Sequence, residues 1–114
     1  MYEYGKGLSQ DHRDAMKWYR KAALQGNTHG QVSLGAIYEH GYGGITQNNK
    51  EAIKWYRKAA EQGDDLAQFI LGNKYYEGRG ISKDFEKAVK WYRKAAKQGM
   101  EAAQEKLNEL GKTW

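Results

Sequence analysis

Apolar and polar side chains recur along this chain with a helical period, and the same arrangement appears three times. Its most regular part is a block of Lys-Trp-Tyr-Arg-Lys-Ala-Ala, which occupies residues 17–23, 54–60 and 90–96. At roughly 100° per residue, the apolar side chains of the first copy lie within an arc of about 160° on one side of a helix. They are Ala15, Met16, Trp18, Tyr19, Ala22 and Ala23. An apolar arc this wide predicts a helix that is buried between two neighbouring helices.

The residues ahead of each block predict where its helix begins. Asp11, Asn48 and Asp84 stand at equivalent positions, and each side chain can accept a hydrogen bond from the first free amides of a helix. Glu51 follows Asn48 by three residues, as in a capping box. We therefore expect one helix to begin at each of these three capping residues.

A Gln-Gly pair after each block predicts where the helix ends, because glycine readily adopts the left-handed conformation that terminates helices. The pairs occupy residues 25–26, 62–63 and 98–99. The three helices are accordingly expected to end at Leu24, Glu61 and Lys97.

A second kind of helix is expected between the blocks. It carries Gln-Val-Ser-Leu-Gly at residues 31–35 and Gln-Phe-Ile-Leu-Gly at 68–72, and residues 104–108 repeat it without the glycine. We expect it to end at Tyr38 and Tyr75, ahead of loops rich in glycine.

Tandem repetition decides the predicted fold. The tryptophans of the three blocks are spaced 37 and 36 residues apart, which is typical of stacked helical repeats. We predict an all-α array of about three helix-turn-helix repeats that forms a single domain over residues 1–114. The expected repeat blocks are 1–26, 27–63 and 64–99, followed by a C-terminal helix at 100–114.

The first residues match the end of a helix of the second kind, because Met1 and Tyr2 align with Ile37 and Tyr38. We therefore expect the chain to be part of a longer array. Terminal repeats normally need a polar cap. The apolar arc of the first block is then expected to be half covered, with self-association or a frayed N-terminus as the predicted consequence.

Three motifs recur in register: Leu-Gly-x-x-Tyr, then Gly-x-Gly with an apolar residue after it, then Ala-x-x-Trp-Tyr-x-Lys-Ala-Ala-x-Gln-Gly. At a period near 36 residues, this sequence resembles the Sel1-like repeat (SLR) family. The resemblance implies a right-handed α-solenoid related to tetratricopeptide repeats, acting as a non-catalytic scaffold or adaptor for protein–protein interactions. Some exported bacterial members carry a disulfide in each repeat, whereas this chain has no cysteine.

The composition offers little for catalysis. Without cysteine there is no thiol nucleophile and no zinc–thiolate site, and no nucleophile–base pair can be nominated. His12, His29 and His40 are separated by whole helical segments, which is not the spacing of metal ligands. The Gly-x-Gly loops lack the preceding strand of a phosphate-binding turn. We therefore expect no enzyme activity, no cofactor and no metal.

The expected cellular compartment depends on whether the chain is complete. No apolar run is long enough to cross a membrane, and the first residues lack the basic flank and apolar centre of a signal peptide. We expect a cytoplasmic protein if the chain is complete, and a periplasmic or secreted one if an upstream segment is missing.

Aromatic residues that the repeat does not require point to a candidate site. Ala67, Leu71 and Tyr75 form the expected core stripe of their helix, and a second stripe runs beside it at spacings of three and four residues. The resemblance to tetratricopeptide-like stacks implies that this second stripe faces a concave groove, where aromatics among carboxylates would hold a peptide or a partner helix. The predicted partner-binding residues are His29, Val32, Ala36, Glu39, Leu66, Phe69, Asn73, Tyr76, Glu105 and Glu109. The alternative is that Phe69 only packs against the adjacent helix of the same, second kind.

Basic residues offer a second candidate surface, which fits the net charge of +5. The stripe consists of Lys17, Arg20, Lys21, Lys54, Arg57, Lys58, Lys90, Arg93, Lys94 and Lys97. It could bind a polyanion or an anionic surface. Against this, Asp14, Glu51 and Glu86 precede three of the lysines by about one turn, and the aromatics of these helices are assigned to the core. Nucleic acid is therefore the less favoured partner, and a protein or peptide the favoured one.

Overall fold

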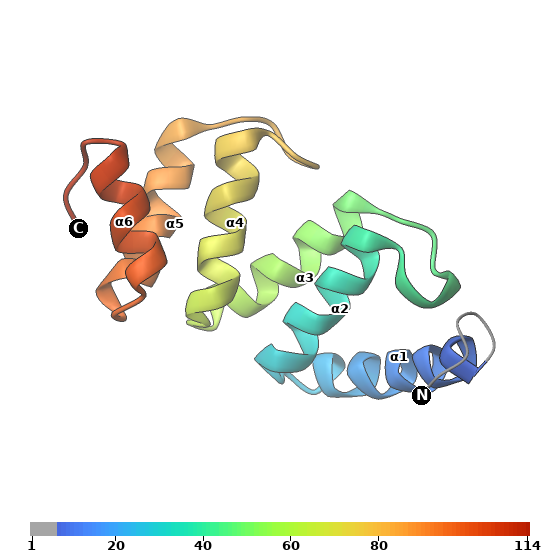
Figure 1. Cartoon of the computed structure of the whole chain (residues 1–114). Coiled ribbons are helices and arrows are strands. Elements are labelled where there is room, and N and C mark those ends of the chain that lie inside the picture. Colours follow the sequence, from blue (N-terminus) through green and yellow to red (C-terminus); the bar gives the residue numbers. More distant parts are fainter. Residues whose placement is uncertain (1–6) are drawn as a thin grey trace. The chain divides into compact units, whose positions relative to one another are not determined.

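The structure is a computed structural model that describes the backbone of residues 7–114 and the side chains of residues 14–42 and 44–114. The described residues form α-helices joined by short turns, one 3-10 helix and no strand (Figure 1). In chain order they are α1 (Gly7–Leu24), α2 (Thr28–His40), η1 (Tyr42–Gly44), α3 (Asn49–Glu61), α4 (Asp65–Glu77), α5 (Phe85–Lys97) and α6 (Glu101–Glu109). The prediction of an all-α helical repeat is confirmed. The chain divides into two compact units, Met1–Trp55 and Tyr56–Trp114.

The block helices α1, α3 and α5 end where the Gln-Gly pairs predict. Their last residues are Leu24, Glu61 and Lys97. The glycine of each pair adopts a positive φ, of 91° at Gly26, 101° at Gly63 and 96° at Gly99. The position of the glycine in each pair was therefore sufficient to predict where these helices end.

The predicted starts are confirmed for α3 and α5. Asn48 Oδ1 accepts a hydrogen bond from the Glu51 amide at 3.1 Å, and Asp84 Oδ1 accepts one from the Lys87 amide at 3.1 Å. The reciprocal half of the expected capping box does not form, since the Asn48 amide donates to the Tyr38 carbonyl at 2.8 Å. The Asn48 amide, which the Glu51 side chain was expected to bind, is therefore bonded to the preceding helix.

The predicted start of α1 is wrong, because α1 begins at Gly7 and Asp11 lies inside it. In the later copies the amide of the capping residue is held by a tyrosine carbonyl of the preceding helix, as in the bond from Asp84 to Tyr75 at 2.9 Å. That bond keeps the chain extended up to the cap. The matching tyrosine of the first copy, Tyr2, and the predicted helix end at Met1 and Tyr2 lie outside the described residues.

The second kind of helix corresponds to α2, α4 and α6. Asn27 and Asp64 cap the first two, each accepting from a backbone amide three residues later at 2.8 Å. These helices run two residues past the predicted ends at Tyr38 and Tyr75. The reason is that Gly41, at φ 72°, and its counterpart Gly78, at φ 73°, donate their amides back to the helix and close it later.

Each unit has its own buried apolar core. In the first unit, Met16, Ala23, Leu34 and Trp55 cluster, and Ile37, Tyr38 and Ile45 pack against them. In the second unit, α4 packs on α5 and α5 on α6 (Figure 1). Its fully buried side chains include Ala67, Leu71, Ala88, Tyr92, Ala95, Ala103 and Leu107. Leu107 thus anchors α6 to the core that α4 and α5 form.

A glutamine on each helix of the second kind binds the end of the block helix before it. The side-chain amide donates to a carbonyl eight residues earlier, and the distances are 3.1 Å for Gln31 to Ala23, 3.2 Å for Gln68 to Ala60 and 3.0 Å for Gln104 to Ala96. The last carbonyls of a helix have no partner within it. Each of these carbonyls also accepts from the amide of the glycine in the Gln-Gly pair, at 2.9 to 3.1 Å. The glutamine therefore supplies a second donor, a role that the sequence pattern had not indicated.

Arginines of the basic stripe bind the following helix in a similar way. Arg20 donates to the Tyr38 hydroxyl at 3.1 Å, and Arg57 donates to the Tyr75 hydroxyl, also 18 residues later, at 2.8 Å. In the third copy a glycine replaces the tyrosine, and Arg93 Nε instead donates to the Thr113 carbonyl at 2.9 Å. Arg20 and Arg57 join adjacent helices, and Arg93 joins α5 to the segment that follows α6. The charge of these three arginines is therefore only partly available to a ligand.

Candidate partner-binding surfaces

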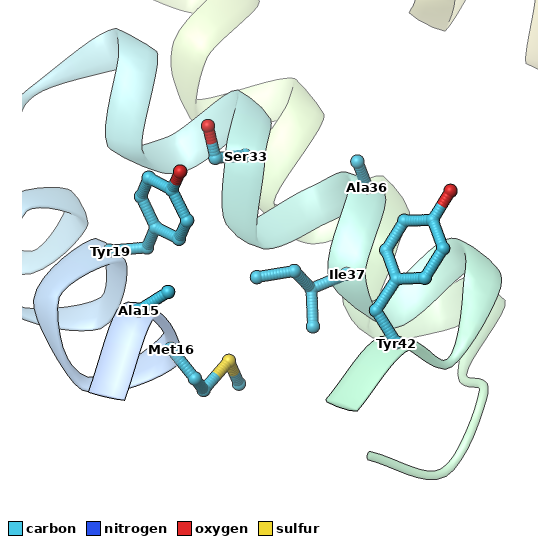
Figure 2. A pocket seen from close by; sticks show the side chains of 7 residues that line it. All are labelled: Ala15, Met16, Tyr19, Ser33, Ala36, Ile37 and Tyr42. Carbon is cyan, nitrogen blue, oxygen red and sulfur yellow. The ribbon is translucent and has the colours of Figure 1, made fainter. Parts of the chain in front are cut away.

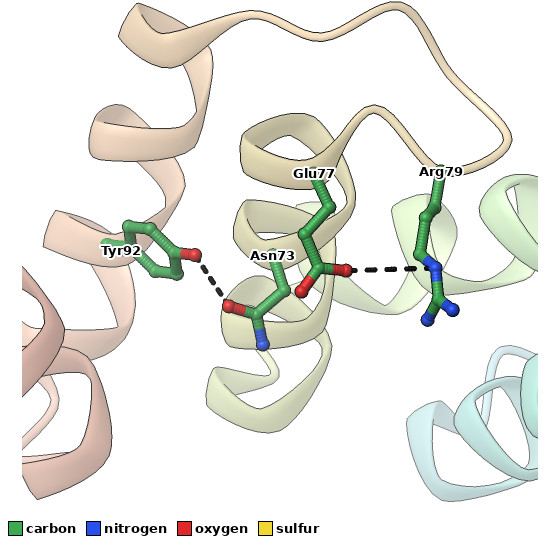
Figure 3. A network of polar contacts seen from close by, with 4 residues as sticks. All are labelled: Asn73, Glu77, Arg79 and Tyr92. Carbon is green, nitrogen blue, oxygen red and sulfur yellow. Dashed lines mark hydrogen bonds and ion pairs between the residues drawn. The ribbon is translucent and has the colours of Figure 1, made fainter.

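The predicted second stripe of α4 lies within the second unit and is partly engaged there. Leu66 is 46% exposed, whereas Phe69 and Asn73 are half-buried against Tyr92 of α5. The ring centroids of Phe69 and Tyr92 are 5.7 Å apart, and the Tyr92 hydroxyl donates to Asn73 Oδ1 at 2.5 Å (Figure 3). Phe69 thus packs on a neighbouring helix, but on α5 rather than on a helix of its own kind.

Tyr76 belongs to a cluster of aromatic and cationic groups at the other end of the stripe. The ring centroid of Tyr76 is 6.3 Å from that of Phe85, and Lys106 Nζ lies 4.5 Å from the Tyr76 centroid. Lys106 Nζ is also 4.0 Å from a carboxylate oxygen of Glu109, which is exposed, as is Glu105. The structure therefore brings Tyr76 and Glu109 together around one lysine.

We give the name α4 surface to six of the predicted partner-binding residues. They are Leu66, Phe69, Asn73, Tyr76, Glu105 and Glu109. The name covers the predicted partner-binding residues that lie in the second unit.

A polar network beside the α4 surface keeps Tyr92 neutral. Burial raises the pKa of Tyr92 well above the ordinary tyrosine value, and the nearby Glu77 carboxylate raises it further. Glu77 itself lies 4.0 Å from Arg79 Nε in an exposed ion pair (Figure 3). Tyr92 consequently remains a hydrogen-bond donor to Asn73 over the physiological pH range.

The other four predicted residues lie on α2, in the first unit. His29 is exposed, and Val32, Ala36 and Glu39 are half-buried. Of these, Ala36 lines a pocket of about 280 Å³ between α1 and α2 (Figure 2). The described residues around the pocket are Ala15, Met16, Tyr19, Ser33, Ala36, Ile37 and Tyr42. The non-periodic Tyr42 was the one sequence signal that could have indicated this pocket.

Trp18 departs from the predicted burial of the block aromatics. It is 70% exposed, whereas Trp55 at the same repeat position is 5% exposed. Ala15, Tyr19 and Ala22 are half-buried, as expected for a half-covered arc. The assignment of the block aromatics to the core is therefore wrong for Trp18, because the described residues leave most of this side chain uncovered.

The basic stripe keeps its lysines in solvent. Lys17, Lys54 and Lys90 are exposed, and none of them forms an ion pair with the carboxylate one turn before it. The expected neutralisation is thus absent at ion-pair distance. Aromatic rings also lie closer to the stripe than predicted, since Lys94 Nζ is 5.8 Å from the Trp91 ring.

Other kinds of site find no support in the part of the chain that the structure describes. It contains no group of three His, Cys, Asp or Glu side chains that could hold a metal ion. Within the same residues, no helix is both long enough and apolar enough to span a bilayer.

The alternation of block helices with capped, glutamine-bound second helices defines a protein of the tandem helix-turn-helix class. The chain belongs to the Sel1 repeat family, whose repeat is recognised at residues 1–27, 28–64 and 65–100. Members of this family generally mediate protein–protein interactions, and their helical repeats typically serve as non-catalytic scaffolds.

Solved structures with the same fold support this membership. A Sel1 repeat protein from Oxalobacter formigenes is 39% identical, with a TM-score of 0.83 over 92% of this chain and 78% of that one. A protective antigen of uropathogenic Escherichia coli that displays an SLR fold is 41% identical, with a TM-score of 0.82 over 95% of this chain and 22% of that one. Helicobacter pylori cysteine-rich protein B is 32% identical, with a TM-score of 0.77 over 81% of this chain and 68% of that one.

A sel1-like repeat-containing protein of Acanthamoeba polyphaga mimivirus is 42% identical over 41 residues. The match covers 36% of this chain but only 8% of that relative. It adds to the evidence for the repeat and says nothing about the activity of either whole protein.

Proposed function

We propose that this chain is a non-catalytic interaction module that binds a peptide or a partner helix on the α4 surface. The observation that carries the proposal is the exposed Leu66 in line with the half-exposed Phe69 and Tyr76 on one side of α4. Aromatic and aliphatic anchors with a polar rim are the usual composition of a binding hot spot. The α2 residues His29, Val32, Ala36 and Glu39 are proposed as partner-binding residues of the first unit in their own right.

The polar groups of the α4 surface suit a peptide backbone. Asn73 Oδ1 accepts from Tyr92, which orients the side chain and leaves its two amide hydrogens to donate to a peptide carbonyl. The exposed Glu105 and Glu109 carboxylates can accept from peptide amides or bind a basic side chain. Tyr92 already holds Asn73, and Lys106 pairs with Glu109.

Leu66 provides the cleanest test, because its exposed side chain can be changed with little effect on the core. The probe is the tightest peptide selected on the wild-type chain from a displayed library of short random peptides. Leu66→Asp should weaken it at least about thirtyfold, as truncation of a hot spot does. The matched control is Leu24→Asp, since Leu24 is also exposed but lies on α1 in the first unit.

The aromatic pair tests the rest of the site. Phe69→Ala combined with Tyr76→Ala should weaken the same probe by at least about thirtyfold, with circular dichroism recorded to separate loss of binding from loss of fold. Normal binding by Leu66→Asp and by a folded double variant would contradict the proposal. If the double variant unfolds, the Leu66→Asp result decides alone.

A further inference from the structure

The two kinds of helix in the second unit carry opposite charge. Helix α5 contains five basic residues and one glutamate, whereas α6 contains three glutamates and one lysine. Helix α4 contains two acidic residues, and its single lysine, Lys74, is buried. The two helices that hold the α4 surface are therefore acidic, although the chain as a whole has a net charge of +5.

Three of these carboxylates lie on or beside the α4 surface. The side chains of Glu77 and Glu109 are 51% and 70% exposed, and Glu105 is exposed as well. Glu77 is close enough to Tyr92 to raise the pKa of the tyrosine, whose hydroxyl is bonded to Asn73 of the surface (Figure 3). Glu105 has no ion-pair partner among the described side chains. The polar side of the α4 surface is therefore acidic and open to solvent.

The aromatic rings at one end of the surface already hold cations. Lys106 Nζ lies 4.5 Å from the ring centroid of Tyr76, and Lys112 Nζ lies 5.8 Å from that of Phe85. A cation within about 6 Å of a ring centroid is attracted by the π electrons of the ring. Glu109, 4.0 Å from Lys106 Nζ, adds its negative charge. Rings and carboxylates together stabilise an ammonium or guanidinium group at this end of the surface.

A block helix could not pack on these carboxylates as α5 packs on α4. Helix α4 meets a tyrosine of α5 through Phe69, Gly72 and Asn73. A Cβ on this glycine would lie 2.8 Å from two ring carbons of Tyr92. The corresponding residues of α6 are Glu105, Asn108 and Glu109. Because a side chain replaces the glycine and carboxylates replace its neighbours, the exposed side of α6 suits a charged ligand better than an apolar helix of a further repeat.

We propose that the α4 surface selects a basic segment of a partner protein. This inference rests on the proposed function of the surface and adds the chemistry of its ligand. An apolar side chain of the segment packs on Leu66 and Phe69. A lysine or arginine of the segment meets the Glu105 and Glu109 carboxylates beside the Tyr76 ring. Apolar contacts carry most of the affinity, and the charges decide which partner is accepted.

A second copy of this chain is the competing occupant, because the block helices expose lysines such as Lys54 and Lys90. It is disfavoured, since two molecules that each carry a net charge of +5 repel each other. A basic segment of a partner avoids that repulsion when the rest of the partner is neutral or acidic.

The probes are two short, end-blocked peptides that share the same leucines and serines. They differ only in carrying lysines or glutamates at the remaining positions. Labelled with a fluorophore and titrated with the full chain at about 150 mM salt, the lysine peptide should bind at least about tenfold tighter than the glutamate peptide. The net charge of +5 taken alone predicts the reverse order.

Charge reversal tests the two carboxylates of α6. Glu105→Lys combined with Glu109→Lys should weaken the lysine peptide at least about tenfold, because like charges then face each other. The matched control is Asp14→Lys combined with Glu61→Lys, which changes the net charge equally at exposed residues outside the α4 surface. The control should weaken the lysine peptide by less than about threefold, because salt screens distant charges.

A change of the opposite sign comes from the resident lysine. Lys106→Gln should tighten the lysine peptide by about threefold or more, because it frees the Tyr76 ring and the Glu109 carboxylate for the incoming cation. A gain of affinity cannot result from loss of fold. If circular dichroism shows that the double reversal unfolds, the result for Lys106→Gln decides alone.

Equal or tighter binding of the glutamate peptide would overturn the proposal. A preference for the lysine peptide that neither the double reversal nor Lys106→Gln alters would also overturn it. Dimers in light scattering that the double reversal abolishes would make a second copy the occupant instead. Failure of the proposed function is recognised separately, because Leu66→Asp would then leave the library-selected peptide bound. If Leu66→Asp releases that peptide and only the preference for lysine is missing, the proposed function stands and this inference fails.

Discussion

At the scale of single residues, Gly72 has little room for a side chain, because a Cβ there would lie 2.8 Å from two ring carbons of Tyr92. Overpacking of a core typically costs about 1–3 kcal/mol, and the better helix propensity of alanine returns at most about 1 kcal/mol. Gly72→Ala should therefore destabilise the protein by about 1–2 kcal/mol, because the ring of the buried Tyr92 has no room to move.

Chemical denaturation measures that loss. Asn108→Ala is the matched control, since Asn108 occupies the same repeat position on α6 and is exposed. It should change stability by less than about 0.5 kcal/mol. Equal stability of the two variants would show that α4 and α5 are not in the close contact described.

The raised pKa of Tyr92 predicts how the free energy of unfolding changes at alkaline pH. Its pKa in the folded protein lies above the unfolded value of about 10. The stability that its neutral hydroxyl contributes is therefore complete below about pH 10 and is lost as the pH rises beyond it. Unfolding free energies of wild type and Tyr92→Phe should diverge above about pH 10, by up to about 1.4 kcal/mol per pH unit. Parallel curves would contradict the assignment of a buried neutral phenol.

At the scale of elements, the block tryptophans differ in burial, from the exposed Trp18 through the half-buried Trp91 to the buried Trp55. Trp55 is buried with Met16 and Leu34, so Trp55→Ala should cost about 3–5 kcal/mol. Trp18 is mostly exposed, so Trp18→Ala should cost less than about 0.5 kcal/mol. Thermal melts of the two variants check this, and a cooperative Trp55→Ala melt close to that of wild type would show that the first core is wrongly described.

Helix ends were predictable wherever the chain carries its own signal. Gly26, Gly63 and Gly99 end the block helices at the expected residues because the left-handed conformation is a local property. The start of α1 was not predictable, because the bond that sets the later starts comes from another helix. The pairing of Asn73 with Tyr92 was equally hidden, since the two are 19 residues apart and nothing local links them.

At the scale of the whole molecule, the net charge of +5 predicts a test that separates the two candidate modes of binding. A peptide held on the α4 surface by apolar contacts should bind nearly equally at 50 and 200 mM salt, because salt screens interactions between charges and leaves apolar contacts nearly unchanged. A polyanion on the lysine stripe, with 6–10 phosphate contacts, would lose about 10³–10⁵ in affinity. Fluorescence anisotropy with the selected peptide and with duplex DNA makes the comparison, and a strong salt dependence for the peptide would favour the stripe.

The apolar pattern indicated the number, kind and order of helices, because each copy repeats the same local instructions. It could not separate a buried block from an exposed one, since Trp18 and Trp55 lie in nearly identical sequence and differ only in what covers them. For the same reason Phe69 and Tyr76 could be recognised as non-periodic, but their contacts with Tyr92 and Phe85 could not. Tertiary neighbours, rather than local sequence, decide these cases.

The glutamine that joins each block helix to the helix after it fixes the length of the turn between them. The donor lies eight residues after its acceptor in all three copies, so an added residue would pull it out of reach. In the glycine loops, the backbone bond that closes the loop spans ten residues from Tyr38 to Asn48 and nine from Tyr75 to Asp84. No bond of fixed short spacing crosses the segment after Gly80 in the second of these loops. A short Gly-Ser insertion after Gly80 should therefore leave the melting temperature nearly unchanged, whereas the same insertion after Gly99 should lower it. The loop after α4 is thus a permissive place for a label or a grafted sequence, and the turn after α5 is not.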